Sequence, residues 1–186
     1  MARALSHARA RLRAQIRAAI RSEGGAAAVE MALVAAPFFM LLFGIIEIAM
    51  IFLISATLEN GMDIAARTIR TGEFQTGGSA NASAFKTTVC NTFGWFKADC
   101  TAHLYIDVRT YTTFSAITQP TVVSNGVFNS SAVTFTPGGP EDIVVVRAYY
   151  QWPLIAPGFN QALQQLNGGM ALLTSTVAFR NEPYGN

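Results

Sequence analysis

The sequence predicts an α+β protein in which a long N-terminal transmembrane and stalk helix is packed by a small antiparallel β-sheet outer domain. Residues 31–54 contain one charged residue, Glu47. Residues 55–70 carry apolar side chains at helical spacing, and residues beyond 100 are rich in Thr, Val, Tyr and Phe, which favour strands. Charged residues make up 13% of the chain, about half of the ~25% usual in soluble domains. Membrane attachment is therefore expected.

Residues 1–25 are a basic leader. They contain six arginines and one glutamate, a net charge of +5, whereas the rest of the chain carries seven basic and ten acidic residues, a net charge of −3. The basic character therefore belongs to the leader and gives no support to nucleic-acid binding by the rest. The arginine excess predicts a cytoplasmic N-terminus, with the chain beyond about Ser55 outside the membrane. A mitochondrial presequence is the alternative that this composition leaves open.

Residues 26–72 are expected to form one helix that crosses the membrane at about residues 31–55 and continues outward as a stalk. A helix over residues 31–54 spans roughly 36 Å, enough for a bilayer core of about 30 Å. This apolar stretch is longer than the core of a secretory signal, and no cleavage site follows it. Pro37 is expected to kink the helix in its first third.

The stalk is predicted from a helical pattern that ends at Thr71-Gly72. Apolar residues form one face, and polar residues occupy the other side. The apolar face comprises Leu58, Met62, Ala65, Ala66 and Ile69, and the polar side comprises Glu59, Asn60, Asp63, Arg67 and Arg70. The apolar face should pack on the outer domain.

The outer domain is expected to comprise residues 73–186. After a flexible link at 75–82, residues 82–93 predict a short helix. Three segments predict strands, at about 103–114, 143–152 and 172–180, and residues 121–136 predict a loop or irregular hairpin. Residues 137–140, Pro-Gly-Gly-Pro, predict a turn. Together these segments indicate three or four antiparallel strands, with the stalk helix covering one face.

The two cysteines, Cys90 and Cys100, both lie on the predicted outer side of the membrane, where a disulfide between them is the favoured interpretation. Two free thiols are the first alternative. The second is a metal pair, because Cys100 and His103 have C-x-x-H spacing, although two ligands are a weak signal for a metal.

Two carboxylates, Glu30 and Glu47, lie within or at the edge of the apolar segment, where a charge is costly and indicates function. Glu30 is interpreted as a contact to a neighbouring subunit, or else as an anion at the headgroup boundary favoured by the helix dipole. Glu47 is interpreted as a polar contact to another transmembrane helix, or else as a side chain that reaches toward the outer interface.

No catalytic set can be assembled from this sequence, so we expect neither an enzyme nor a cofactor. His7 lies in the leader, and His103 begins a strand. Asp107, Glu141 and Asp142 are interpreted as solvated or turn residues. Four aromatic residues of the outer domain are expected in its core, with an adhesive or subunit-packing patch as the alternative: Tyr149, Tyr150, Trp152 and Phe159.

In its first helix the chain resembles the TadE-like family, the minor pilins or pseudopilins of the tight-adherence (Tad or Flp) type IV pilus. The resemblance covers about residues 24–72, and Val177–Tyr184 looks like the family's terminal strand with its Glu-Pro ending. The matching pieces of the helix are Gly25 with Glu30, Pro37, Gly44-Ile-Ile-Glu47, Leu58-Glu59, Ala65-Ala66-Arg67 and Thr71-Gly72.

The resemblance implies a single-pass protein of the bacterial inner membrane with a periplasmic C-terminal domain. A prepilin peptidase would cleave between Gly25 and Ala26, where small side chains leave the scissile bond accessible. The new amine at Ala26 would then meet Glu30 of a neighbouring subunit. The implied partners are other pilins, pseudopilins and the inner-membrane assembly platform, and the implied role is pilus assembly and surface adherence. The rivals are an uncleaved envelope protein whose outer domain binds a partner, and a membrane-tethered enzyme.

Overall fold

The computed structural model describes residues 23–78, 80–155 and 160–185. The leader predicted at 1–25 lies almost wholly outside these residues. The chain divides into two compact units between Ile45 and Ile46. The α+β class predicted from the sequence is confirmed by the second unit, which contains both helices and the antiparallel sheet.

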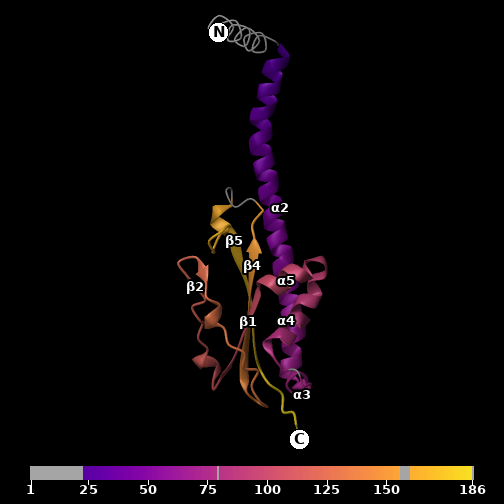
Figure 1. Cartoon of the computed structure of the whole chain (residues 1–186), viewed down its shortest axis with the longest axis vertical. Helices are drawn as coiled ribbons and strands as arrows, with labels where there is room; N and C mark the ends of the chain where they lie inside the picture. The colour runs from indigo at the N-terminus through magenta and orange to yellow at the C-terminus, as the bar shows by residue number, and fades with distance from the viewer. Residues whose placement is uncertain (1–22, 79, 156–159, 186) are drawn as a thin grey trace, which may run out of the picture. The chain divides into compact units, whose positions relative to one another are not determined.

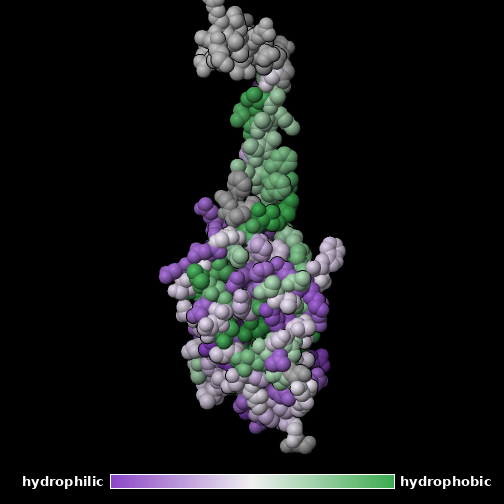
Figure 2. Space-filling view, in the orientation of Figure 1, coloured by the Kyte–Doolittle hydropathy of each residue, from purple (hydrophilic) through white to green (hydrophobic). Residues whose placement is uncertain are grey.

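The first unit contains the N-terminal half of α2 (Glu23–Arg70). From Val29 to Ile46 the large apolar side chains of this helix are exposed (Figure 2). The helix continues through Pro37 without a break, so the kink at this residue stays a prediction. By length and apolar composition this helix is able to cross a membrane.

The C-terminal half of α2 belongs to the second unit and packs as the stalk pattern predicts. Leu58, Met62 and Ile69 are at most 1% exposed, whereas the charged side chains between them are exposed. The helix ends at Arg70, and the N–H of Gly72 donates to the carbonyl of Ile69. Gly72 has φ 79°, a left-handed conformation that favours glycine at a helix end.

Several short helices follow α2 and lie beside it (Figure 1). They are α3 (Glu73–Thr76), α4 (Ala82–Cys90), the 3-10 helix η1 (Asn91–Phe96) and α5 (Lys97–His103). Asn81 begins α4 as an N-cap, because its side chain accepts a hydrogen bond from the N–H of Ala84. The helix predicted at 82–93 is confirmed, with its last turn tightened into η1.

The sheet has three antiparallel strands in the order β1-β4-β5. These are β1 (Leu104–Tyr111), β4 (Ile143–Pro153) and β5 (Met170–Arg180). The central strand β4 pairs with both neighbours, so that Asp107 faces Arg147 on one side and Arg147 faces Thr176 on the other. All three predicted strands are confirmed. The 3-10 turn η4 (Gln161–Leu163) lies in the connection between β4 and β5.

Residues 112–136 form an irregular segment with a hairpin of two-residue strands, β2 (Val123–Ser124) and β3 (Val127–Phe128). Asn125 and Gly126 form its turn with φ angles of 51° and 73°, as a two-residue hairpin with positive φ at both positions requires. The 3-10 turns η2 (Phe114–Ala116) and η3 (Ser130–Ala132) flank the hairpin.

The sheet of the second unit lies between two covers (Figure 1). One face packs on α2, α4 and α5 through the core, which includes Val108, Val146 and Tyr150. The other face is covered by residues 112–136, where the ring of Phe128 packs on Tyr105 and Tyr149. Residues on both sides of the strands are therefore buried, which the alternating pattern of β1 did not predict.

The C-terminal residues return to the end of α2. The N–H of Glu182 donates to the carbonyl of Arg70, and the two side chains form an ion pair of 3.2 Å. The ring of Tyr184 lies against Gly72 so closely that a Cβ there would be 2.3 Å from its Cγ atom. The last turn of α2 is thus completed by residues at the other end of the chain.

Candidate functional site

The bond between Gly25 and Ala26 lies in the first turns of α2, which begins at Glu23. Glycine lowers helix stability by about 1 kcal/mol relative to alanine, and Gly24 and Gly25 stand together at this end. The three alanines that follow favour the helix. The sequence therefore places its weakest helical residues directly before the predicted processing site.

Glu30 lies one turn beyond this site, and its side chain is exposed. It belongs to none of the ion pairs found in the described part of the chain. Its neighbours Val29 and Met31 are 60% and 70% exposed. Glu30 is thus a carboxylate on an otherwise apolar and uncovered surface, and its pairing with another subunit stays a prediction.

Glu47 differs sharply from Glu30, because it is fully buried. Its carboxylate accepts hydrogen bonds from the backbone N–H of Ile155 and from the side-chain amide of Asn160. Both donors lie in the connection between β4 and β5. The partners that the structure gives Glu47 are therefore in its own chain, and a contact to another transmembrane helix stays a prediction.

A second buried carboxylate, Asp107, corrects the sequence-based interpretation that this residue is solvated. It is fully buried and lies 2.9 Å from Nε of Arg109 and 3.3 Å from Nη1 of Arg147. It also accepts a hydrogen bond of 2.8 Å from the N–H of Thr134. The two arginines extend to the carbonyls of Ala132 and Thr118, so the cluster fastens residues 112–136 to the sheet. We assign it a structural role.

This cluster also affects Tyr111, at the end of β1. Burial alone would raise the pKa of its phenol, but hydrogen bonds with Arg147 and Thr118 and the nearby positive charges lower that pKa below its ordinary value. This shift in the pKa of Tyr111 is a consequence of the structural cluster, and we assign Tyr111 no catalytic role.

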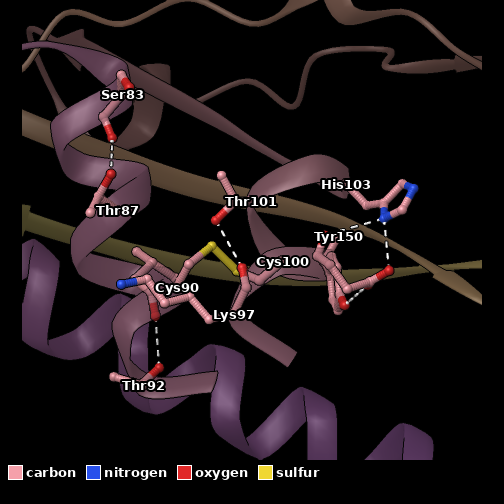
Figure 3. Close-up of a disulfide and its surroundings, with 11 residues drawn as sticks. Ser83, Thr87, Cys90, Thr92, Lys97, Cys100, Thr101, His103 and Tyr150 are labelled. Carbon is pink, nitrogen blue, oxygen red and sulfur yellow. Dashed lines mark hydrogen bonds and ion pairs between the residues drawn. A yellow bond between two sulfur atoms is a disulfide. The ribbon is translucent and has the colours of Figure 1, made fainter. Parts of the chain in front are cut away.

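The structure contains the predicted disulfide between Cys90 and Cys100, which joins the end of α4 to α5 (Figure 3). Both cysteines are fully buried. The neighbouring His103 pairs with Asp99 at 3.1 Å. Because both sulfurs are in the disulfide, neither the free-thiol alternative nor the pair of Cys100 with His103 as metal ligands is supported. In the part of the chain that is described, no cluster of three metal-ligating side chains occurs.

Asp99 also accepts a hydrogen bond from the hydroxyl of Tyr150, a residue that is labelled in Figure 3. Burial, and then this bond and the charge of Asp99, raise the pKa of Tyr150 well above its ordinary value. Asp99 thus joins His103 of α5 to Tyr150 of β4, next in sequence to the disulfide at Cys100.

Three of the four aromatic residues expected in the core are there: Tyr149, Tyr150 and Trp152 are at most 5% exposed. Phe159 lies outside the described residues. The aromatic residue that the sequence analysis missed is Trp95, which is 99% exposed in η1. Its neighbours in sequence, Phe93 and Phe96, pack inward, so the aromatic run did not reveal which ring points outward.

Comparison with known families gives one finding. The family model described as TadE-like protein matches residues 25–67, which is the part of α2 from the predicted processing site to its last turn. Neither a curated protein nor a solved structure matches the chain. The resemblance read from Gly25, Glu30 and the stalk is therefore confirmed over residues 25–67, where the chain is TadE-like, and this match indicates a Tad pilus-associated protein.

Proposed function

We propose that this protein is a minor pilin or pseudopilin of a Tad (Flp) type IV pilus that acts in pilus assembly and surface adherence. The observation that carries the proposal is the TadE-like match, which begins at Gly25 and continues along α2 to residue 67. The protein would be anchored in the bacterial inner membrane, with its sheet domain in the periplasm. Its partners would be a prepilin peptidase, other pilins or pseudopilins, and the assembly platform.

The processing step requires that residues around Gly25 and Ala26 leave the helix, because a protease binds an extended strand of substrate. The two glycines make this unwinding inexpensive, and the alanines after them present no bulk to the peptidase. Cleavage would remove all six arginines of the leader. The product would begin with a free amine four residues before Glu30.

The proposed role of Glu30 is supported by its uncovered position. An unpaired carboxylate in hydrocarbon is costly, and so is an unpaired ammonium group. If the N-terminal ammonium group of a neighbouring subunit met the carboxylate of Glu30, the two charges would form one ion pair. Such a pair fixes the register between two helices. Glu30 is exposed and thus available for this contact, whereas Glu47 is enclosed by its own domain.

The first experiment is to determine the N-terminus of the protein from the membrane fraction by intact mass and terminal peptide. We expect a chain that begins at Ala26, and the full-length chain in cells that lack the peptidase. Gly25→Val should block processing, while Gly44→Val, a glycine deeper in the same helix, should not. A wild-type chain that still carries the leader would contradict the proposal.

A second experiment tests the subunit contact. Glu30→Ala should leave membrane insertion and processing intact but strongly reduce piliation, because the ammonium group loses its partner. Glu59→Ala removes an exposed glutamate from the polar side of the same helix and should leave piliation unchanged. Normal piliation in the Glu30 variant would remove this residue from the mechanism.

The second candidate function is an uncleaved single-pass envelope protein whose outer domain binds a partner. The helical conformation of the Gly25–Ala26 bond favours this alternative, since an intact helix resists proteolysis. The N-terminal measurement separates the two candidates directly.

A further inference from the structure

The apolar surface of α2 changes character at Glu47. Before it, from Val29 to Ile46, exposed large hydrophobic residues point in all directions around the helix. At Glu47 the exposed fraction falls to 0%, and from there a buried stripe through Ile54 and Leu58 packs on the sheet domain. The outer domain thus begins to cover the helix eight residues before Ser55, where the predicted membrane segment ends.

The polar groups that meet Glu47 do not belong in hydrocarbon. Ile155 presents a backbone N–H to the carboxylate, and Asn160 presents its amide. Both belong to an irregular connection between two strands, and irregular backbone does not occur against lipid tails because its peptide groups would be unsatisfied there. The level of Glu47 on α2 must therefore lie outside the hydrocarbon core.

The length of the remaining helix fits this boundary. Residues 26–46 are 21 residues, which rise about 32 Å as a helix and match a hydrocarbon core of about 30 Å. The membrane segment then starts at Ala26 rather than at residue 31. Glu30 becomes a group about 6 Å inside the core.

The face of α2 directly beyond Glu47 is still apolar. Ile48, Phe52 and Leu53 are 43%, 70% and 57% exposed, and Ile155 beside Glu47 is 64% exposed. Exposed charged residues begin only at Glu59. Along the helix, Ile48 lies about 3 Å and Leu53 about 10 Å beyond Ile46. The exposed apolar face therefore extends across the headgroup layer, which adds about 5–8 Å on each side of the core, and the exposed charges begin beyond that layer.

We propose that the hydrocarbon core ends at Ile46 and that the outer domain rests on the lipid headgroup layer through an apolar rim formed by Ile48, Phe52, Leu53 and Ile155. Glu47 is the positioning residue of this rim, because it holds the connection between β4 and β5 at the boundary. The inference rests on the membrane anchoring in the proposed function, but it needs neither processing nor a pilus.

The first test places single cysteines at two leucines of similar exposure in the full chain. Leu41 is 63% exposed and Leu53 is 57% exposed, but they lie on opposite sides of the proposed boundary. In proteoliposomes, a membrane-impermeant maleimide should label L53C at least tenfold faster than L41C, and after denaturation in urea and dodecyl sulfate the two rates should converge. The unsubstituted chain is the control, since its two cysteines form a disulfide.

Equal protection of L53C and L41C in proteoliposomes would overturn the proposal and return the boundary to Ser55. Equal labelling of both in the bilayer would also overturn it, because the helix would then lie outside the hydrocarbon. An altered N-terminus or a loss of pili has no bearing on these rates, so failure of this inference is distinct from failure of the proposed function.

The second test addresses Glu47 by hydrogen exchange of the Ile155 amide in the detergent-solubilised protein. Glu47→Leu should accelerate exchange at this amide by roughly tenfold, the effect of losing one hydrogen bond of ordinary strength. Glu47→Gln keeps an acceptor oxygen and should retain most of the protection. Glu59→Leu is the matched control on the exposed side of the helix. Unchanged exchange in the Glu47→Leu variant would remove Glu47 from the positioning of the rim.

Discussion

The two halves of α2 lie in opposite surroundings, and only the second half has a polar side, which begins at Glu59. Before Ile46 the helix is apolar on every side and its side chains are uncovered, whereas after it one stripe is buried in the core of the second unit. Each half contains one glutamate among apolar residues. Glu30 is exposed, and Glu47 is enclosed by hydrogen-bond donors from the same chain.

This difference shows that the apolar sequence of a helix does not identify which part of the protein, or which other molecule, packs against it. The second half finds its partner within the chain, in the sheet and in the helices α4 and α5. The first half finds none among the described residues of its own unit, and in the proposed function lipid and other subunits would cover it. Mutations in the second half of α2 should therefore lower the stability of the outer domain, whereas mutations in the first half should affect assembly and leave that stability unchanged.

The largest effect is expected from matched leucines in the two halves. Leu58→Ala should lower the free energy of unfolding of the outer domain by about 2–5 kcal/mol, because a fully buried side chain leaves a cavity. Leu41→Ala should leave it unchanged, since Leu41 is 63% exposed. Urea unfolding in detergent, followed by tryptophan fluorescence, measures both. An equal loss of unfolding free energy in the two variants would contradict this division of α2 into a half that packs in the domain and a half that does not.

The disulfide gives the next effect, again confined to the second half. Cys90→Ser with Cys100→Ser should lower the free energy of unfolding by about 2–3 kcal/mol, because a short cross-link no longer restricts the unfolded chain. Membrane insertion should be unaffected. The comparison of oxidised and reduced wild-type protein in the same urea titration provides an independent check. An unchanged free energy of unfolding in both comparisons would show that the disulfide adds nothing to the stability of the outer domain.

A smaller effect is expected where α2 ends. Gly72→Ala should cost about 1–3 kcal/mol, because alanine is strained at φ 79° and its Cβ would meet the ring of Tyr184. Gly78→Ala is the control, since Gly78 has a similar φ of 76° and no atom within 4 Å of an added Cβ. A difference between their thermal unfolding midpoints isolates the contact with Tyr184. Equal midpoints would mean that the C-terminal residues do not support the helix.

The smallest effect is the pH dependence contributed by Tyr150. Its folded-state pKa lies above its ordinary value of 10.0, so its contribution to stability is fully present below pH 10 and is lost as the pH rises further. Between pH 9 and 10.5 we expect a loss of about 0.8 kcal/mol from this group. Tyr150→Phe should flatten this part of the profile, whereas an unchanged slope would assign the dependence to other groups. Urea midpoints at the two pH values measure it.

Local patterns were sufficient to predict the helix, the three strands and the disulfide. The buried face of the stalk was predicted correctly, because it follows directly from the helical spacing of Leu58, Met62 and Ile69. The strands were predicted from runs of β-branched residues between turn residues. The irregular character of residues 121–136 was also predicted from their composition.

The environments of the buried carboxylates could not be predicted, because their partners are far away in sequence. Asp107 alternates with apolar residues in β1 and was interpreted as solvated, but residues 112–136 cover that face and bring Thr134 to it. Glu47 meets Ile155 across more than one hundred residues. Sequence spacing identified Glu47 as unusual, but it did not indicate a partner within the same chain.

The return of the C-terminus to α2 has a consequence for biosynthesis. The end of α2 is completed by the bond from Glu182 to Arg70 and by the ring of Tyr184, and the central strand β4 needs β5 as its second neighbour. In the proposed function the apolar helix would enter the bilayer before Glu182 and Tyr184 are translated, and the outer domain would close only after β5 and these two residues have crossed the membrane. Until then the inserted helix would carry an open domain whose apolar core side chains are still uncovered.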